Sequence, residues 1–267
     1  MSFLDALPDH YRLILCDVSG VVHDGAHLYP GAAERLQAWR GEGRKVVLIT
    51  NAPRTADVIE AQLHRLGLPQ TAWDAIATSG EAGIAALREL GKPVGFIGTE
   101  EDRRIVERAG LTVANGGDFT DLAAAGVTPE RPSLADYEPE LRAAAERGVT
   151  LHVLNPDRVV LHRGERMVCA GAFGDFYEAI GGRVCWYGKP GAAIYGHALK
   201  LAGDPPPDAV LAIGDSLETD MAGAARMGFD GLFVHGGIHA DEPLPEDIGA
   251  HVGVPGWRPV AVVQSLA

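Results

Sequence analysis

Short apolar runs alternate along the chain with segments whose apolar residues recur every three or four positions. The runs at 12–16 and 45–50 are rich in Leu, Ile and Val, which predicts strands buried on both faces. Segments 31–40 and 55–66 place apolar side chains on one helical face, and Gly67 marks a helix end. Further strands are predicted at residues 94–98, 150–154, 184–187, 209–213 and 232–235. This alternation predicts a parallel sheet covered by helices on both sides.

The middle of the chain has a different pattern. Residues 112–139 contain Asn115-Gly116-Gly117, an Ala/Gly run and three prolines, which predicts a loop-rich stretch. We interpret residues 80–182 as an inserted domain, and residues 1–79 and 183–267 as one discontinuous core. The expected fold class is therefore α/β, with a doubly wound parallel-sheet core and a large inserted α/β domain.

The charge of the chain narrows its expected partners. With 36 acidic residues against 23 Lys and Arg, the formal net charge is −13. This charge repels phosphate backbones and anionic lipids, so neither nucleic acid nor a membrane is an expected partner. Residues 1–12 do not resemble a signal peptide, and no stretch reaches the roughly 18 apolar residues of a membrane span. We expect a cytoplasmic protein in which a few groups at the binding site, and not the overall charge of the chain, hold any phosphorylated ligand.

Polar residues follow four of the predicted core strands, where ligands of an open parallel sheet bind. They are Asp17-Val18-Ser19, Thr50-Asn51, Gly188-Lys189-Pro190 and Gly214-Asp215-Ser216, with Asp220 shortly after. Two carboxylates suit Mg²⁺ beside a bound phosphate, and a hydroxyl, a backbone N–H and a lysine suit phosphate oxygens. Each signal alone is also typical of a turn or a helix cap. All four at one sheet edge predict a phosphoryl-transfer site.

The same segments resemble the motifs of a known family. Residues 15–25, 49–51, 188–190 and 213–220 are similar to the four motifs of the haloacid dehalogenase-like (HAD) hydrolases. Asn155-Pro156-Asp157 and Cys169-Ala170-Gly171 resemble subfamily IIA, which has a large α/β cap and includes sugar-phosphate, nucleotide and 4-nitrophenyl phosphatases. The resemblance covers nearly the whole chain and is weakest at 112–139. It implies that the inserted domain is such a cap.

The resemblance also implies a nucleophile and a metal site. Asp17 matches the nucleophile that attacks phosphorus and becomes an aspartyl phosphate. Asp17, Asp215 and the backbone carbonyl of Ser19 match the ligands of Mg²⁺, the implied cofactor.

The phosphate holders are implied in the same way. Thr50, the Asn51 backbone and Lys189 match the groups that hold the transferred phosphate. Asp220 matches an acid that orients Lys189 or metal-bound water and is not itself a metal ligand.

The chain departs from the family pattern at Ser19. The family's phosphatases usually have there a second Asp, which protonates the leaving alkoxide and then activates water. A serine hydroxyl has no useful pKa near neutrality, and general acid–base catalysis contributes about 10²–10⁴ in rate. Three alternatives follow. Another group takes over the role of the missing Asp, namely His23, Asp24, a cap residue or water. Otherwise the enzyme is slow and phosphorylated Asp17 persists, or the protein binds a phosphorylated ligand without turnover. We expect the first: a Mg²⁺-dependent hydrolase of a small phosphorylated metabolite, with catalytic residues Asp17, Ser19 and Lys189.

Other features are left open by the sequence. His23 and Asp24 have a simpler interpretation, which we favour, as a pair that stabilises their own loop. Asn155 and Asp157 either contact the site or form a hinge or turn. The glycines between His235 and His239 favour a site rim over a zinc site. The oligomeric state is undecided, and a homodimer through the cap remains open.

Overall fold

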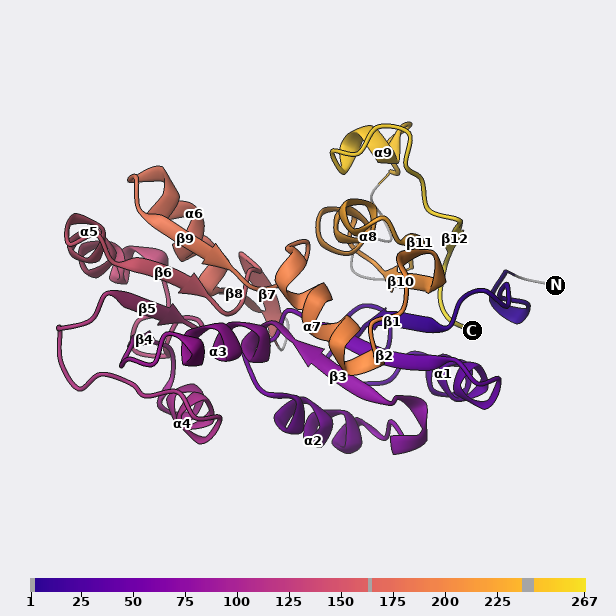
Figure 1. The fold of residues 1–267 in the computed structure, drawn as a ribbon, viewed down its shortest axis with the longest axis horizontal. Helices are drawn as coiled ribbons and strands as arrows, with labels where there is room; N and C mark the ends of the chain where they lie inside the picture. Colours follow the sequence, from indigo (N-terminus) through magenta and orange to yellow (C-terminus); the bar gives the residue numbers. More distant parts are fainter. Residues whose placement is uncertain (1–2, 163–164, 237–242) are drawn as a thin grey trace. The chain divides into compact units, whose positions relative to one another are not determined.

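The computed structural model describes residues 3–162, 165–236 and 243–267 (Figure 1). The chain divides into two compact units. The first comprises Met1–Thr50, Ile59–Ala77 and Lys189–Ala267, and the second comprises Asn51–Val58 and Thr78–Gly188. No helix among the described residues is both long and apolar enough to cross a membrane.

The first unit is built on a six-stranded sheet with the order β12-β11-β10-β1-β2-β3. Its strands are β1 (Leu13–Asp17), β2 (Lys45–Thr50), β3 (Ala75–Thr78), β10 (Val210–Gly214), β11 (Asp230–Val234) and β12 (Ala261–Val263). β1 is parallel to both β2 and β10, and β10, β11 and β12 continue in parallel. The chain moves outward from β1 in one direction and from β10 in the other. The strand order therefore reverses between β1 and β10, the point at which doubly wound sheets bind ligands.

The first two helices of the first unit lie where the sequence predicted them. They are α1 (Ala32–Gly41), α2 (Ala56–Leu66), α7 (Ala192–Ala202), α8 (Ala222–Met227) and α9 (Ile248–His251). The predicted elements at 12–16, 31–40, 45–50, 55–66, 209–213 and 232–235 correspond to observed ones within two residues at every boundary. β3 and β12, of four and three residues, were not predicted.

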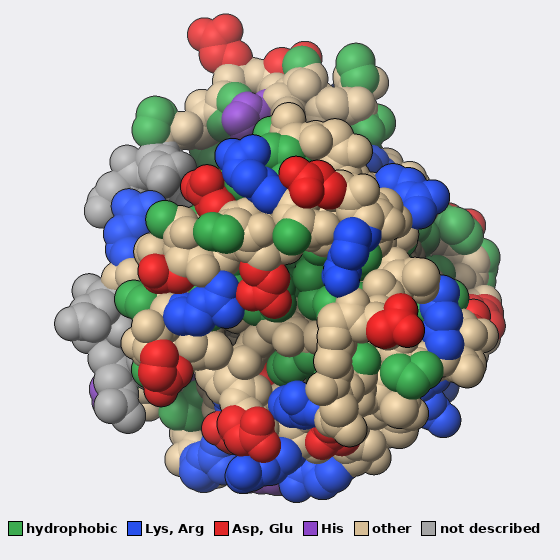
Figure 2. Space-filling view, turned by 90° about the vertical axis from the view of Figure 1, so that its left-hand side faces the viewer, with side chains coloured by type: hydrophobic (Ala, Val, Ile, Leu, Met, Phe, Trp, Pro, Cys, Tyr) green, Lys and Arg blue, Asp and Glu red, His purple; other side chains and the backbone are tan. Residues whose placement is uncertain are grey.

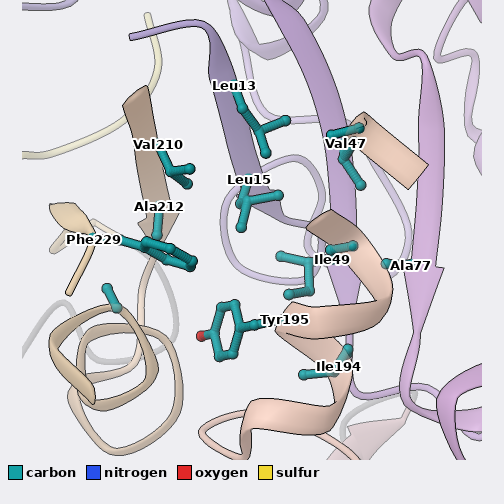
Figure 3. Close-up of a cluster of buried hydrophobic side chains, with 13 residues drawn as sticks. Leu13, Leu15, Val47, Ile49, Ala77, Ile194, Tyr195, Val210, Ala212 and Phe229 are labelled. Carbon is teal, nitrogen blue, oxygen red and sulfur yellow. The ribbon is translucent and has the colours of Figure 1, made fainter. Parts of the chain in front are cut away.

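Side chains on both faces of the central strands are buried, as the apolar runs predicted. On one face, Leu13 and Leu15 of β1 pack with Tyr195 of α7 in a continuous cluster (Figure 3). The alternate residues Ile14 and Cys16 are fully buried as well. Burying each large apolar side chain contributes about 1.5–3 kcal/mol, so the strands are firmly placed and so are the residues at their ends.

The second unit contains a four-stranded parallel sheet with the order β4-β5-β6-β9, and a hairpin of β7 and β8. Its strands are β4 (Gly95–Ile97), β5 (Asp121–Ala124), β6 (Thr150–Val153), β7 (Val159–His162), β8 (Glu165–Val168) and β9 (Arg183–Trp186). Its helices are α3 (Ser79–Glu89), α4 (Glu100–Arg108), α5 (Glu138–Glu146) and α6 (Ala170–Ala179). Two apolar clusters flank the sheet: α5 and α6 supply one, and α3 and α4 supply the other.

One sequence-based expectation needs correction here, and another is incomplete. The strand expected in the core at 184–187 is β9, which pairs with β6 in the second sheet, so a core segment beginning at residue 183 starts too early. An apolar run predicts a buried strand but not the strand with which it pairs. The stretch 112–139 is loop-rich as expected, but it also contains the inner strand β5, whose Ala123 and Ala124 are fully buried. Alanine has low β-propensity, so only the tertiary packing of this strand identifies it.

Candidate active site

Three carboxylates converge at the point where the strand order of the first sheet reverses. Asp17 is the last residue of β1, and Asp215 directly follows β10; Cys16 pairs with Ile213 across these two parallel strands. One ligand oxygen from each of Asp17, Asp215 and Asp220 lies within 4.8 Å of the others. All three residues are buried, between 3% and 6% exposed. The structure therefore brings together the three acids that the sequence singled out.

Lys189 joins two of these acids. Its Nζ donates hydrogen bonds to Asp17 Oδ1 at 2.5 Å and to Asp220 Oδ1 at 2.7 Å, and the side chain is 3% exposed. Buried charges are tolerated only when they are paired and hydrogen-bonded. One ammonium among three carboxylates leaves an excess of negative charge at the site.

The pKa values of Asp17 and Lys189 follow from this burial and pairing. Burial raises the pKa of Asp17 well above its usual range, and Asp220 and Asp215 add to that shift, although Lys189 acts against it. Burial alone would lower the pKa of Lys189, but Asp17 and Asp220 outweigh it and raise that pKa well above its usual value. Lys189 is therefore a permanent cation, and the ionised form of Asp17 depends on the positive charge around it.

Two glycines let the backbone come close to the acids. Gly20 has φ of +86°, and a β-carbon there would overlap the Asp215 carboxylate. A β-carbon on Gly214 would overlap the side chain of Asp220. Any other residue at either position would displace a carboxylate, so the packing requires glycine at both.

Two residues to which the sequence analysis gave no role support Asp220. The backbone N–H of Ser216 donates to Asp220 Oδ2 at 3.3 Å, and Ser216 Oγ accepts from the Thr219 N–H at 3.2 Å. Tyr195 donates its hydroxyl to the Asp220 carbonyl at 3.4 Å. Ser216 could have been identified as a helix cap before Leu217–Met221. Nothing in the pattern of α7 distinguishes Tyr195 from an ordinary core residue.

Thr50 and Ser19 lie on the segments that follow β2 and β1. Asp17 pairs with Ile49 across β1 and β2, so Thr50 is one step further along the same sheet edge. Ser19 is exposed in the loop after β1. No hydrogen bond to its carbonyl oxygen is found within the described part of the chain, which leaves that oxygen available as a ligand.

Asn51 belongs to the second unit, whereas its chain neighbour Thr50 belongs to the first. Its Nδ2 donates to Asp157 Oδ1 at 2.8 Å, and Asn155 Oδ1 accepts from the Asp157 N–H at 3.1 Å. Asn155 and Asp157 thus form a turn to which Asn51 is tied within this unit. Of the glycine-rich rim expected between His235 and His239, residues 237–239 lie outside the described residues.

His23 and Asp24 make their hydrogen bonds to their own loop. The Gly25 N–H donates to His23 Nδ1 at 2.8 Å, and Asp24 Oδ1 accepts from the N–H groups of Ala26 and His27 at 2.8 and 2.7 Å. Burial lowers the pKa of His23, which favours the neutral imidazole. These contacts agree with the loop-stabilising interpretation of both residues.

The donor set fits a divalent cation. Hard cations such as Mg²⁺ bind carboxylate and carbonyl oxygens, often together with oxygens of a phosphate. Asp17, Asp215 and the Ser19 carbonyl offer such oxygens, and the excess negative charge among the buried acids would be offset by a cation. The residues present therefore suit the metal that the sequence implied.

Comparison with known proteins defines the class to which this fold and site belong. Residues 14–112 match the family model for haloacid dehalogenase-like hydrolases, and residues 186–267 match a HAD-hydrolase-like model. A crystal structure of a haloacid dehalogenase-like hydrolase from Brucella suis 1330 superposes with a TM-score of 0.86 at 32% identity, covering 99% of this chain and 98% of that one. The chain belongs to the haloacid dehalogenase-like hydrolase family, as its motifs indicated, and it is an enzyme of that family.

Individual relatives carry more specific names. The chain is 24% identical to the 5′-nucleotidase YutF of Bacillus subtilis, over 89% of this chain and 92% of that protein. It is 28% identical to the ribonucleotide monophosphatase NagD of Escherichia coli K12, over 91% of this chain and 94% of that protein. These names agree with the expectation of a phosphatase.

Proposed function

We propose that this protein hydrolyses small phosphomonoesters, with Asp17 as the nucleophile. The observation that carries the proposal is the buried pairing of Lys189 with Asp17 and Asp220 beside Asp215, at the reversal point of the sheet. The names of the nucleotidase and phosphatase relatives support the substrate class. We also assign the first unit as the catalytic core and the second as the substrate-selecting cap. The homodimer and the cytoplasmic location remain predictions from the sequence.

The proposed reaction has two steps. In the first, a carboxylate oxygen of Asp17 forms a bond to phosphorus, the ester P–O bond breaks, and the departing alkoxide takes up a proton. In the second, a water oxygen bonds to phosphorus and loses a proton, which replaces the proton taken up by the alkoxide, and the bond between phosphorus and Asp17 breaks. Inorganic phosphate leaves, and the Asp17 carboxylate is restored. Lys189 favours the ionised form of Asp17 and places positive charge where phosphoryl oxygens would lie. Thr50 and the Asn51 backbone are the proposed holders of the remaining oxygens.

The proposed metal ligands are Asp17, Asp215 and the Ser19 carbonyl, and the proposed ion is Mg²⁺. A divalent cation in this place would offset the negative charge of nucleophile and phosphate and polarise the phosphoryl group. Asp220 does not have to bind the metal for this purpose. Its 2.7 Å contact to Lys189 and its bond from the Ser216 N–H make it the residue that positions the lysine.

Ser19 supports a second candidate function, in which the protein binds a phosphorylated ligand with little or no turnover and acts in regulation. The specific observation is that Ser19 lies in the position of the usual acid, while the nearby His23 and Asp24 are bound to their own loop. The phosphate-holding groups are the same in both candidates. They differ in whether a proton can be delivered to the leaving group.

One assay separates the two candidates. We expect the full chain to hydrolyse 4-nitrophenyl phosphate in Mg²⁺ and to stop in EDTA. Saturable binding of inorganic phosphate in Mg²⁺ without turnover of this activated ester would favour the binding function. Absence of both turnover and phosphate binding would contradict both candidates.

A further inference from the structure

A pocket with a volume of about 390 Å³ lies entirely within the second unit. It is lined by α4, α5, the first residues of β4 and β5, and the segment 113–119 that connects towards β5. Small-molecule sites in proteins typically measure about 300–1,000 Å³. The pocket shares no lining residue with the candidate active site.

Part of the wall of this pocket is apolar and aromatic, and the rest is polar. Phe96, Val113, Phe119 and Leu122 contribute apolar surface. The Phe119 ring lies directly over Gly95, where a β-carbon would overlap the ring. The missing side chain of Gly95 therefore lets Phe119 fold down over the start of β4 and form one side of the cavity.

The charged groups of the lining favour an anion. Arg103 and Arg147 line the pocket together with one acid, Glu140, and both guanidinium nitrogens Nη1 and Nη2 of Arg131 donate to Glu140 Oε2 at 3.1 Å. Arg103 donates through Nε to Glu107 Oε1 at 3.1 Å and through Nη2 to Asn115 Oδ1 at 3.3 Å, which together use two of the five guanidinium donors. Basic and acidic side chains are intermixed on the end of the unit that carries α4 and α5 (Figure 2). The pocket, by contrast, concentrates two arginines in a chain of net charge −13.

Arg147 is held in place. Its Nη1 donates to the Gly117 carbonyl at 2.6 Å, and its guanidinium carbon lies 5.1 Å from the centroid of the Phe119 ring. The backbone N–H groups of Gly116 and Gly117 make no hydrogen bond to any described residue, so they add further donors beside the guanidinium. A positioned guanidinium next to an aromatic wall matches a carboxylate attached to a flat apolar body.

We propose that this pocket is a second ligand site, which binds a small carboxylate with a ring-shaped apolar body. The ring would lie against Phe96 and Phe119, and the carboxylate would face Arg103 and Arg147. The proposal is independent of the function assigned to Asp17, because all the groups that it uses belong to the second unit.

The test is a calorimetric titration of the full chain with 2-naphthoate, and with the uncharged 2-naphthalenemethanol for comparison. We expect one saturable site for naphthoate and binding of the alcohol that is weaker by about tenfold or more, since a charge-assisted hydrogen bond contributes at least that ratio. Arg147→Gln should weaken naphthoate binding to a similar extent. Arg142→Gln, on the same helix but outside the pocket, is the matched control and should leave it unchanged.

A second variant keeps the test decisive if Arg147→Gln loses stability. Ala143 is exposed on α5 and lines the pocket, so the larger side chain of Ala143→Leu would fill the pocket without disturbing the buried core. Leucine is also a good helix former. We expect it to abolish naphthoate binding while turnover of 4-nitrophenyl phosphate stays the same. The proposal is overturned by the absence of saturable naphthoate binding, by equal binding of the alcohol, or by a site insensitive to Ala143→Leu. None of these results depends on whether the enzyme turns over.

Discussion

The Lys189 ammonium lies 2.5 Å from Asp17 Oδ1, although 172 residues separate the two in sequence. The same ammonium lies 2.7 Å from Asp220, so one cation holds the acid at the end of β1 and an acid in the segment after β10. Removing one partner of such a buried pair leaves a charge that the surroundings do not compensate. The following predictions use this contact and its neighbours.

Asp17→Asn should lower the turnover of 4-nitrophenyl phosphate on the order of 10⁴-fold or more, because an amide does not attack phosphorus. The fold should persist, because the amide is nearly isosteric and Lys189 keeps its bond to Asp220. Steady-state kinetics and a thermal melt measure the two effects. Asp208→Asn, an exposed acid of the same unit, is the control and should retain full activity. A variant at Asp17 that keeps a substantial fraction of activity would rule out the covalent mechanism.

Asp215→Asn tests the metal site. The variant should need more Mg²⁺ for half-maximal activity, or lose activity, because an amide oxygen carries no charge to attract the ion. In EDTA it should melt at a higher temperature than the wild type, since one of the mutually repelling buried acids is gone. A Mg²⁺ titration and melts in EDTA measure these effects against Asp208→Asn. If the Mg²⁺ dependence does not change, Asp215 is not a metal ligand.

Much of the first unit is encoded locally and was predictable for that reason. Leu13 to Cys16 are apolar on both faces, which occurs in a central parallel strand, and Asp17 breaks that pattern at the strand end. Parallel strands bring their carboxyl ends to one edge. Asp17 and Asp215 could therefore be placed together before their distance was known.

The rest depends on contacts that no local pattern encodes. β9 has the composition of a core strand, but its pairing with β6 places it in the second sheet. Ala123 and Ala124 form an inner strand because helices pack on both sides, not because alanine prefers strands. The bond from Tyr195 to the Asp220 carbonyl also arises only when α7 and the turn after β10 have packed.

The hydrogen-bond network around the buried Asp121 in the second unit predicts a pH-dependent stability. Burial alone would raise the pKa of Asp121, but hydrogen bonds from Lys92, Thr120 and His152 outweigh it and lower that pKa to about 2. The unfolded-state pKa is about 3.9, so the folded state gains about 2 kcal/mol that is present above pH 4 and is lost as the pH falls towards 2. Asp121→Asn should remove this gain at pH 7, and its free energy of unfolding should fall less than that of the wild type as the pH is lowered from 4 towards 2. Urea unfolding at several pH values measures it.

The control for this experiment is Asp118→Asn, an exposed acid that lies shortly before the same strand. It should leave the stability at pH 7 within about 0.5 kcal/mol of the wild type. If Asp121→Asn and the wild type lose the same free energy of unfolding as the pH falls, Lys92 and His152 do not stabilise the Asp121 carboxylate.

Ser19→Asp tests whether the missing acid limits the chemistry. If the proton to the leaving group is limiting, the variant should hydrolyse alkyl phosphates faster by up to about 10²–10⁴-fold. The gain for 4-nitrophenyl phosphate should be smaller, because its phenolate leaves without a proton. If hydrolysis of the aspartyl phosphate is limiting instead, the wild type should release a burst of one nitrophenol per site, and the variant should lose the burst and gain steady rate.

The matched control is Ser19→Asn, which has the size of Asp but no acid, so it should give none of these gains. Because Ser19→Asp adds another carboxylate to a site that already holds three, its Mg²⁺ requirement should rise, and the rates have to be compared at saturating metal. Stopped-flow release of nitrophenol and steady-state rates on an alkyl phosphate separate the two limiting steps. A wild type that already hydrolyses alkyl phosphates quickly, with no gain from Ser19→Asp, would show that another group supplies the proton. His23→Gln and Asp24→Asn would then identify it, because the loop that holds both residues begins directly after Ser19.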